Sequence, residues 1–216
     1  MRLSNQKVLL TVVFTLSFAA MSFAQTVNEA GEKLNEGIQN LKAQKYDLAI
    51  SSFESCIQIC DMVGMDAFDV RSKAESQIPN VYFKSAVAKY KSKDYLAAIE
   101  KFKKTAEIAK KYNNTKLERN SAKNVPALYS SLANAEIKRK NFDKAIGLLD
   151  EAIAYNNKYI KAYFAKARVY KAQKNTALLQ KNVDKIIEIK ANGKTAINAR
   201  ELAGNYFLND AINAIG

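Results

Sequence analysis

Residues 141–152 read NFDKAIGLLDEA, and the spacing of apolar and small residues in this stretch decides the fold. Separations of three, four, seven and ten residues place such side chains on one face of a helix. The members of this stripe are Phe142, Ala145, Ile146, Leu149 and Ala152. The stretch is therefore predicted to be an amphipathic helix that buries this face.

The same stripe returns elsewhere in the chain, beginning at Tyr46, Tyr95 and, in a weaker copy, Thr176. A second helical stripe with a small central residue precedes three of the copies. These small residues are Ala86, Ala133 and Ala167; in the first copy only Gly37 and Leu41 hold the pattern. A small residue lets two helix backbones approach closely. Each unit is therefore predicted to be a helix, a short polar turn and a second helix.

These units resemble tetratricopeptide repeats, a family with a unit of about 34 residues and small or aromatic side chains at fixed positions. The copy over 126–159 matches best, through Tyr129, Leu132, Ala133, Phe142, Ala145, Leu149 and Ala152. The resemblance covers residues 30–192. It implies an all-α fold, a right-handed α-solenoid of antiparallel helix hairpins with about four repeats.

The spacing of the copies departs from the family pattern. Tyr46 and Tyr95 are 49 residues apart and Tyr95 and Phe142 are 47 apart, so two inserts of 15 and 13 residues separate repeats. We expect the inserts to add helical turns. Pro79 and Pro126 follow them and are expected to open a leading helix or to kink it. The repeat domain is predicted over 25–193, with a C-terminal capping helix over 194–216.

The N-terminus has the features of an export signal. Arg2 and Lys7 precede an apolar run over 8–24, which ends in small residues before Gln25. Residues 1–24 are therefore predicted to be a cleaved signal peptide, and the protein to be periplasmic or extracellular. The alternative is an uncleaved membrane anchor formed by 8–24, although 17 residues is close to the minimum that spans a bilayer.

Composition excludes several kinds of chemistry. The 216 residues include no His, so neither a Ser-His nor a Cys-His nucleophile system can form. No Gly-rich phosphate loop occurs, and two thiols alone do not make a metal site. We therefore expect a non-enzymatic protein with no cofactor, no metal and no nucleic-acid partner.

The two cysteines, Cys56 and Cys60, are four residues apart on one predicted helix. Side chains at this spacing run parallel rather than converge, which disfavours a disulfide between them. Cys56 also occupies a small-residue position of the stripe. Buried core residues are the favoured interpretation, and a disulfide is the alternative.

By resemblance, motif positions 5, 9 and 13 of the leading helices face a groove that binds peptide segments. The candidate partner-binding residues are Phe83, Val87, Lys91, Asn134, Lys138, Phe164 and Arg168. An apolar segment followed by acidic groups suits this mixture. The alternative is that the apolar positions only pack against neighbouring helices. The family's carboxylate clamp is not matched beyond Asn134, since Ala165 stands where it needs Asn.

Together these features predict a cell-envelope adaptor or scaffold that binds a protein or peptide. Charge offers an alternative function. The chain carries 34 basic and 21 acidic residues, a net +13, and loss of Arg2 and Lys7 with the signal leaves 32 basic residues and +11. The alternative is a basic structural protein attached to an anionic envelope polymer or lipid, unless the lysines only solvate helix faces.

Overall fold

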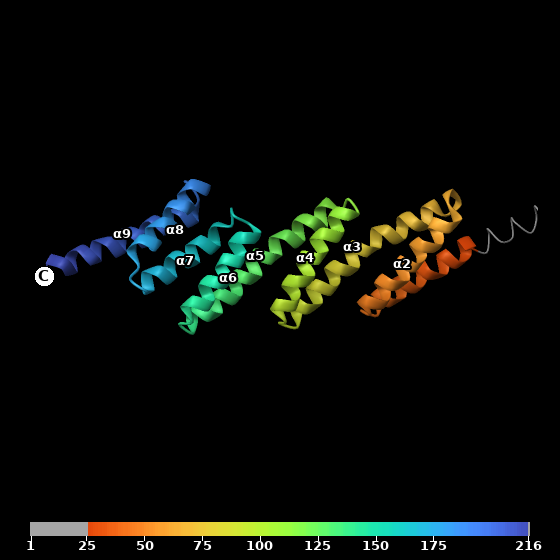
Figure 1. Ribbon diagram of the computed structural model, residues 1–216, viewed down its shortest axis with the longest axis horizontal. Helices are drawn as coiled ribbons and strands as arrows, with labels where there is room; N and C mark the ends of the chain where they lie inside the picture. Colours follow the sequence, from red (N-terminus) through yellow and green to blue (C-terminus); the bar gives the residue numbers. More distant parts are fainter. Residues whose placement is uncertain (1–25, 216) are drawn as a thin grey trace, which may run out of the picture. The chain divides into compact units, whose positions relative to one another are not determined.

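The computed structural model describes residues 26–215, which are helical apart from their turns (Figure 1). No strand occurs in this range, which confirms the predicted all-α class. The predicted signal peptide lies outside the described residues. The first described helix covers 26–42, and the elements that follow are α2 (Tyr46–Val63), the 3-10 turn η1 (Met65–Ala67), α3 (Phe68–Lys91), α4 (Tyr95–Lys111), α5 (Thr115–Lys138), α6 (Phe142–Tyr155), α7 (Ile160–Ala172), α8 (Thr176–Ile189) and α9 (Lys194–Ile215).

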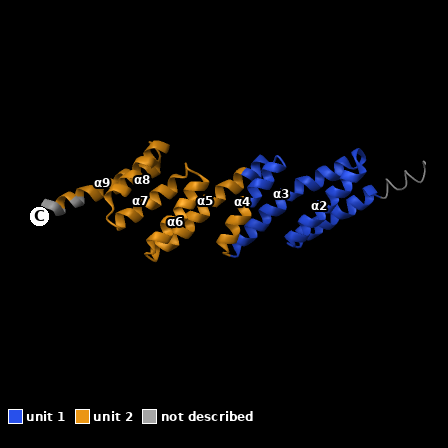
Figure 2. Ribbon diagram, in the orientation of Figure 1, with its two compact units in different colours: residues 1–92, 104–118 blue, residues 93–103, 119–216 orange. Residues whose placement is uncertain are grey.

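The chain divides into two compact units (Figure 2). Unit 1 runs up to residue 92 and includes 104–118; unit 2 contains 93–103 and 119–216. The helix α4 therefore contributes its first half to unit 2 and its second half to unit 1. Both units are built from consecutive helices joined by short turns, as the hairpin pattern predicts.

In unit 1 the core forms where the helix over 26–42, α2 and α3 meet. Phe53, Ile78 and Val81 are fully buried there. Gly37 faces the Phe53 ring so closely that a Cβ on the glycine would lie 2.6 Å from Phe53 Cε1. The second half of α4 adds Ile108 to this core. The small residue at the centre of the first helix thus leaves room for a large side chain from the next helix.

In unit 2, α7 packs against α6 and α8, and α9 packs against both α7 and α8. Leu179, Val183 and Ile186 of α8 are buried in the resulting core. The helix α9 covers them with small residues, Ala196 and Ala199, which have no exposed surface. The helix α9 therefore covers an apolar face that would otherwise meet water.

Five turns between helices share one backbone conformation. A non-glycine residue adopts positive φ just before the residue that precedes the next helix; these residues are Gln44, Lys93, Asn113, Lys140 and Lys174. The residue that follows often caps the helix. Asn114 Oδ1 accepts a hydrogen bond from Leu117 N and Asn175 Oδ1 accepts one from Leu178 N, each 3.1 Å long. The same turn geometry recurring along the chain is independent support for a repeat.

The two prolines correct one expectation. Neither opens a helix: α3 begins at Phe68 and α5 at Thr115, each 11 residues before its proline. The inserts do form extra helical turns, as predicted. A residue before proline normally disfavours helix, yet Ile78 and Val125 are helical and at most 1% exposed. Burial of these side chains outweighs the local preference, and the helices continue through the prolines.

Candidate functional site

Three of the predicted partner-binding residues lie together in unit 1. Phe83, Val87 and Lys91 line a cleft of about 480 Å³ near the end of α3. The other residues that line it are Leu41, Lys42, Gln44, Tyr46, Lys84 and Ala88. We call this site the lysine-rimmed cleft.

Three elements build the lysine-rimmed cleft: the end of the helix over 26–42, the turn that begins α2, and the last turns of α3. Leu41 is buried, and Tyr46, Phe83 and Val87 are half-buried, so apolar surface forms the floor. The left-handed conformation of Gln44, with φ 59°, directs the chain from one helix into the next at the edge of the cleft. The floor therefore depends on the same turn that closes the hairpin.

The rim is basic. The side chains of Lys42, Lys84 and Lys91 are exposed, and no acidic residue lines the cleft. None of the three lysines forms an ion pair within residues 26–215. Their charges are therefore available to a bound carboxylate.

Neither Lys84 nor Tyr46 was predicted from the sequence to belong to this site. The signal for Lys84 was present, because Lys84, Val87 and Lys91 are separated by three and four residues and share a helix face with Ala88. Tyr46 was recognised only as the first aromatic of a repeat. Its position beside the turn at 43–45 brings it to the cleft as well.

The other four predicted residues lie in unit 2. Asn134 and Lys138 are exposed on α5, and Arg168 is exposed on α7. Phe164 is half-buried and packs against the core around α8. Much of its side chain therefore contacts neighbouring helices, as the alternative interpretation of the apolar positions expects. Their role in partner binding stays a prediction.

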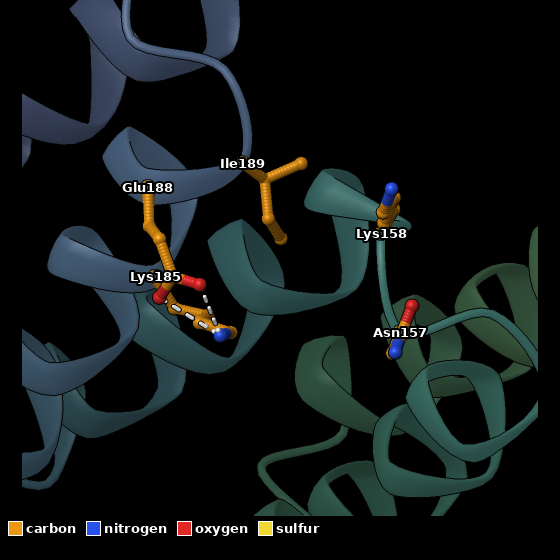
Figure 3. Close-up of a pocket in the computed structure, with 5 residues that line it drawn as sticks. All are labelled: Asn157, Lys158, Lys185, Glu188 and Ile189. Atoms are coloured by element: carbon orange, nitrogen blue, oxygen red, sulfur yellow. Dashed lines mark hydrogen bonds and ion pairs between the residues drawn. The ribbon is translucent and has the colours of Figure 1, made fainter.

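A second pocket, of about 350 Å³, lies in unit 2 between the segment after α6 and the end of α8 (Figure 3). Asn157 and Lys158 line one side, and Lys185, Glu188 and Ile189 line the other. Lys185 Nζ lies 2.7 and 2.8 Å from the two carboxylate oxygens of Glu188. This hydrogen-bonded ion pair raises the pKa of Lys185. Glu188 also neutralises the positive charge of Lys185, so this charge does not attract an anionic ligand to the pocket.

The cysteines are buried and free, as the favoured interpretation predicted. Burial raises the pKa of Cys56 to about 12, with a smaller effect from Cys60. Within residues 26–215 no group of three acidic or sulfur side chains is placed to hold a metal ion. None of the helices described is long and apolar enough to cross a membrane.

Buried small residues recur at fixed positions in the hairpins. Leading helices carry a buried small residue at the same repeat position, and second helices carry another; these are Gly37, Ala86, Ala133 and Ala167, and Ala49, Ala98 and Ala145. The six alanines have no exposed surface. Small residues at these positions are what the resemblance to tetratricopeptide repeats implies.

Comparison with solved structures finds TPR domains among the proteins that this chain is similar to. The first TPR of Spaghetti (RPAP3), bound to an HSP90 peptide, is 24% identical over 60% of this chain and 94% of its own, with a TM-score of 0.35. MamA is 21% identical over 82% and 87% of the two chains, with a TM-score of 0.34. A TPR2AB domain of yeast Sti1, in a pHSP90 complex, is 19% identical over 83% and 98%, with a TM-score of 0.33. No protein-family model matches the sequence, and a search of curated proteins finds no match.

Proposed function

We propose that this protein is a non-enzymatic adaptor of the cell envelope that binds a segment of another protein in the lysine-rimmed cleft. One observation carries the proposal: an apolar floor and three exposed, unpaired lysines occur together in a cleft of about 480 Å³. Arrays of this type offer such surfaces to peptide segments.

The chemistry of the cleft defines the segment. Phe83 and Val87 favour a large apolar side chain, because both leave part of an apolar surface in contact with water. Lys84 and Lys91 favour Asp or Glu nearby. The bound segment therefore combines one or two large apolar residues with acidic residues. The lysines of the cleft repel basic segments and so exclude them.

A selection experiment tests this chemistry without knowledge of the natural partner. The protein, in the form isolated from its host, is used to select peptides of about 12 residues from a random display library. The affinity of each selected peptide is then measured by calorimetric titration. We expect selected peptides to be rich in Asp or Glu beside Phe, Leu, Ile or Met.

Matched variants show where the peptides bind. The double variant Lys84→Glu, Lys91→Glu reverses the rim and is expected to weaken binding at least about tenfold. The control Lys116→Glu, Lys158→Glu makes the same change in net charge at exposed sites outside the cleft and is expected to leave affinity unchanged. Equal weakening in both variants would mean that only net charge attracts the peptides.

The location in the envelope is part of this proposal and depends on the apolar run over 8–24. We expect the protein isolated from its host to begin at Gln25, which N-terminal mass analysis of the exported fraction measures. A chain that keeps residues 1–24 and stays with the membrane would support the anchor formed by 8–24 instead.

The alternative function is attachment to an anionic envelope polymer or lipid, favoured by the surplus of basic residues. Binding to vesicles with anionic lipid, or to purified wall polymer, separates the two functions. Attachment by charge alone should weaken steeply between about 0.05 and 0.5 M salt and respond equally to both double variants. Binding in the cleft responds to the rim variant only.

A further inference from the structure

The connection between α2 and α3 in unit 1 exposes large apolar side chains. The exposed fractions are 75% for Met62, 85% for Met65 and 61% for Phe68. Asp66 and Asp69 are also exposed here, and neither forms an ion pair within residues 26–215. We call these five residues the apolar–acidic tip.

Exposure of three large apolar residues within seven positions is unusual for a turn between helices, where polar residues dominate. The turn is well formed: Gly64 has φ 83° and its N–H donates to Cys60 O. Its base is also fixed, because Arg71 Nη1 lies 2.9 Å from Asp61 Oδ1. An ordered turn therefore presents this apolar surface, and methionine adapts readily to a partner surface.

The apolar–acidic tip has the chemistry that the lysine-rimmed cleft selects. It combines Met65 and Phe68 with the carboxylates of Asp66 and Asp69, whereas the cleft combines Phe83 and Val87 with lysines. The rest of the chain is strongly basic, so two copies repel each other elsewhere. The tip differs from the rest of the chain because its charged side chains, Asp66 and Asp69, are both negative.

A copy cannot place its own tip in its own cleft. The helix α3 separates the two features, because Phe68 of the tip is its first residue and Lys84 and Lys91 of the cleft lie in its last turns. The 16 residues from Phe68 to Lys84 correspond to about 24 Å of continuous helix. A tip that enters a cleft must therefore come from another molecule.

We propose that the apolar–acidic tip of one copy binds the lysine-rimmed cleft of a second copy. Asp66 and Asp69 then meet Lys84 and Lys91 while Met65 and Phe68 cover the floor. The two surfaces differ, so the contact is head-to-tail and leaves a free tip and a free cleft at the ends, which produces open chains or rings. This inference rests on the proposed function of the cleft and names a second copy of the chain as its occupant.

Sedimentation velocity of the full chain, as its host processes it, tests the proposal. The tip presents five residues, so we expect weak association, with the weight-average mass rising as concentration increases to about 0.5 mM. The rim variant Lys84→Glu, Lys91→Glu and the tip variant Asp66→Lys, Asp69→Lys are each expected to associate at least about tenfold more weakly. The control Lys116→Glu, Lys158→Glu associates as the wild type does.

A mixture of the two variants makes the test specific. The rim variant keeps an acidic tip and the tip variant keeps a basic cleft, so the original contact can form between them. The two reversed surfaces also match each other. An equimolar mixture is therefore expected to recover association that neither variant shows alone, which also proves that both are folded.

Three results would overturn this inference: a wild type that stays monomeric, association that survives both variants, or a mixture that does not recover. A monomeric wild type whose cleft still binds selected apolar–acidic peptides would keep the proposed function and remove only self-association. A wild type that neither associates nor binds such peptides would remove both.

Discussion

The contact between Gly37 and Phe53 fixes how closely the first two helices of unit 1 approach. We expect Gly37→Ala to lower the free energy of unfolding by about 1–3 kcal/mol, because the new Cβ would overlap the buried ring. Urea unfolding and amide hydrogen exchange in α2 measure this.

Gly31 provides the control in the same helix, because a Cβ there meets no atom within 4 Å. Gly31→Ala is expected to stabilise the helix by about 0.5–1 kcal/mol. If both substitutions stabilised the protein equally, the close approach at Gly37 would be contradicted.

The thiols of Cys56 and Cys60 are expected to be unreactive in the folded protein. With a pKa of about 12, only about one Cys56 in ten thousand is a thiolate at pH 8. A thiol reagent such as DTNB should therefore label neither cysteine until the protein is unfolded, and then label both. Ser51→Cys, on the exposed face of the same helix, should react at once. Native cysteines that react as fast as this control would contradict their burial.

At the scale of elements, Glu136 ties together the hairpin of α5 and α6. Its carboxylate accepts hydrogen bonds from Asn141 Nδ2 at 2.8 Å, Arg139 Nη1 at 2.9 Å and Lys144 Nζ at 3.2 Å. These bonds, that of Asn141 first, hold the pKa of Glu136 below its usual value. A carboxyl with a lowered pKa stabilises the fold above its unfolded pKa of about 4.3, and this contribution is lost as the pH falls through its folded pKa.

Glu136→Gln is therefore expected to be less stable than the wild type at pH 7, and the difference should shrink as the pH falls below about 4. Urea unfolding at pH 7, 5 and 3 measures this difference. The exposed Glu151→Gln serves as control and should change stability by less than about 0.5 kcal/mol. A difference for Glu136→Gln that does not depend on pH would show that its charge is not what holds the hairpin.

The closing helix α9 offers another test at this scale. Ala199 is fully buried against α7 and α8, whereas its neighbour Asn198 is exposed. Ala199→Asp places an unpaired charge in that core and is expected to cost at least about 3 kcal/mol. Asn198→Asp should cost little. Equal effects in thermal unfolding and in hydrogen exchange of α8 would mean that α9 does not cover the core.

Helices and hairpins could be predicted from the sequence because their signals are local: an apolar stripe, a small residue and a polar turn. The start of α3 and of α5 could not. A proline is the strongest local signal for a helix start, but Pro79 and Pro126 lie in helices held by buried neighbours such as Ile78 and Val125. Which surface covers those neighbours is a tertiary property.

In the candidate site, too, local sequence patterns predicted part of the arrangement and tertiary packing decided the rest. The resemblance to tetratricopeptide repeats placed Phe83, Val87 and Lys91 on one surface, and the structure brings them together. The position of a residue within one repeat does not show which other helices pack over it. The sequence therefore did not reveal that Phe164 packs against the core around α8. Nor did it show that Tyr46, from the preceding hairpin turn, completes the cleft.

Lysine footprinting of the full chain, with and without a selected apolar–acidic peptide, tests directly whether the lysine-rimmed cleft is the binding site. Acetylation rates at each lysine are read by mass spectrometry. We predict that saturating peptide slows acetylation of Lys42, Lys84 and Lys91 several-fold while Lys116 and Lys158 keep their rates. Unchanged rates at the three rim lysines, with protection elsewhere or nowhere, would contradict the lysine-rimmed cleft as the binding site.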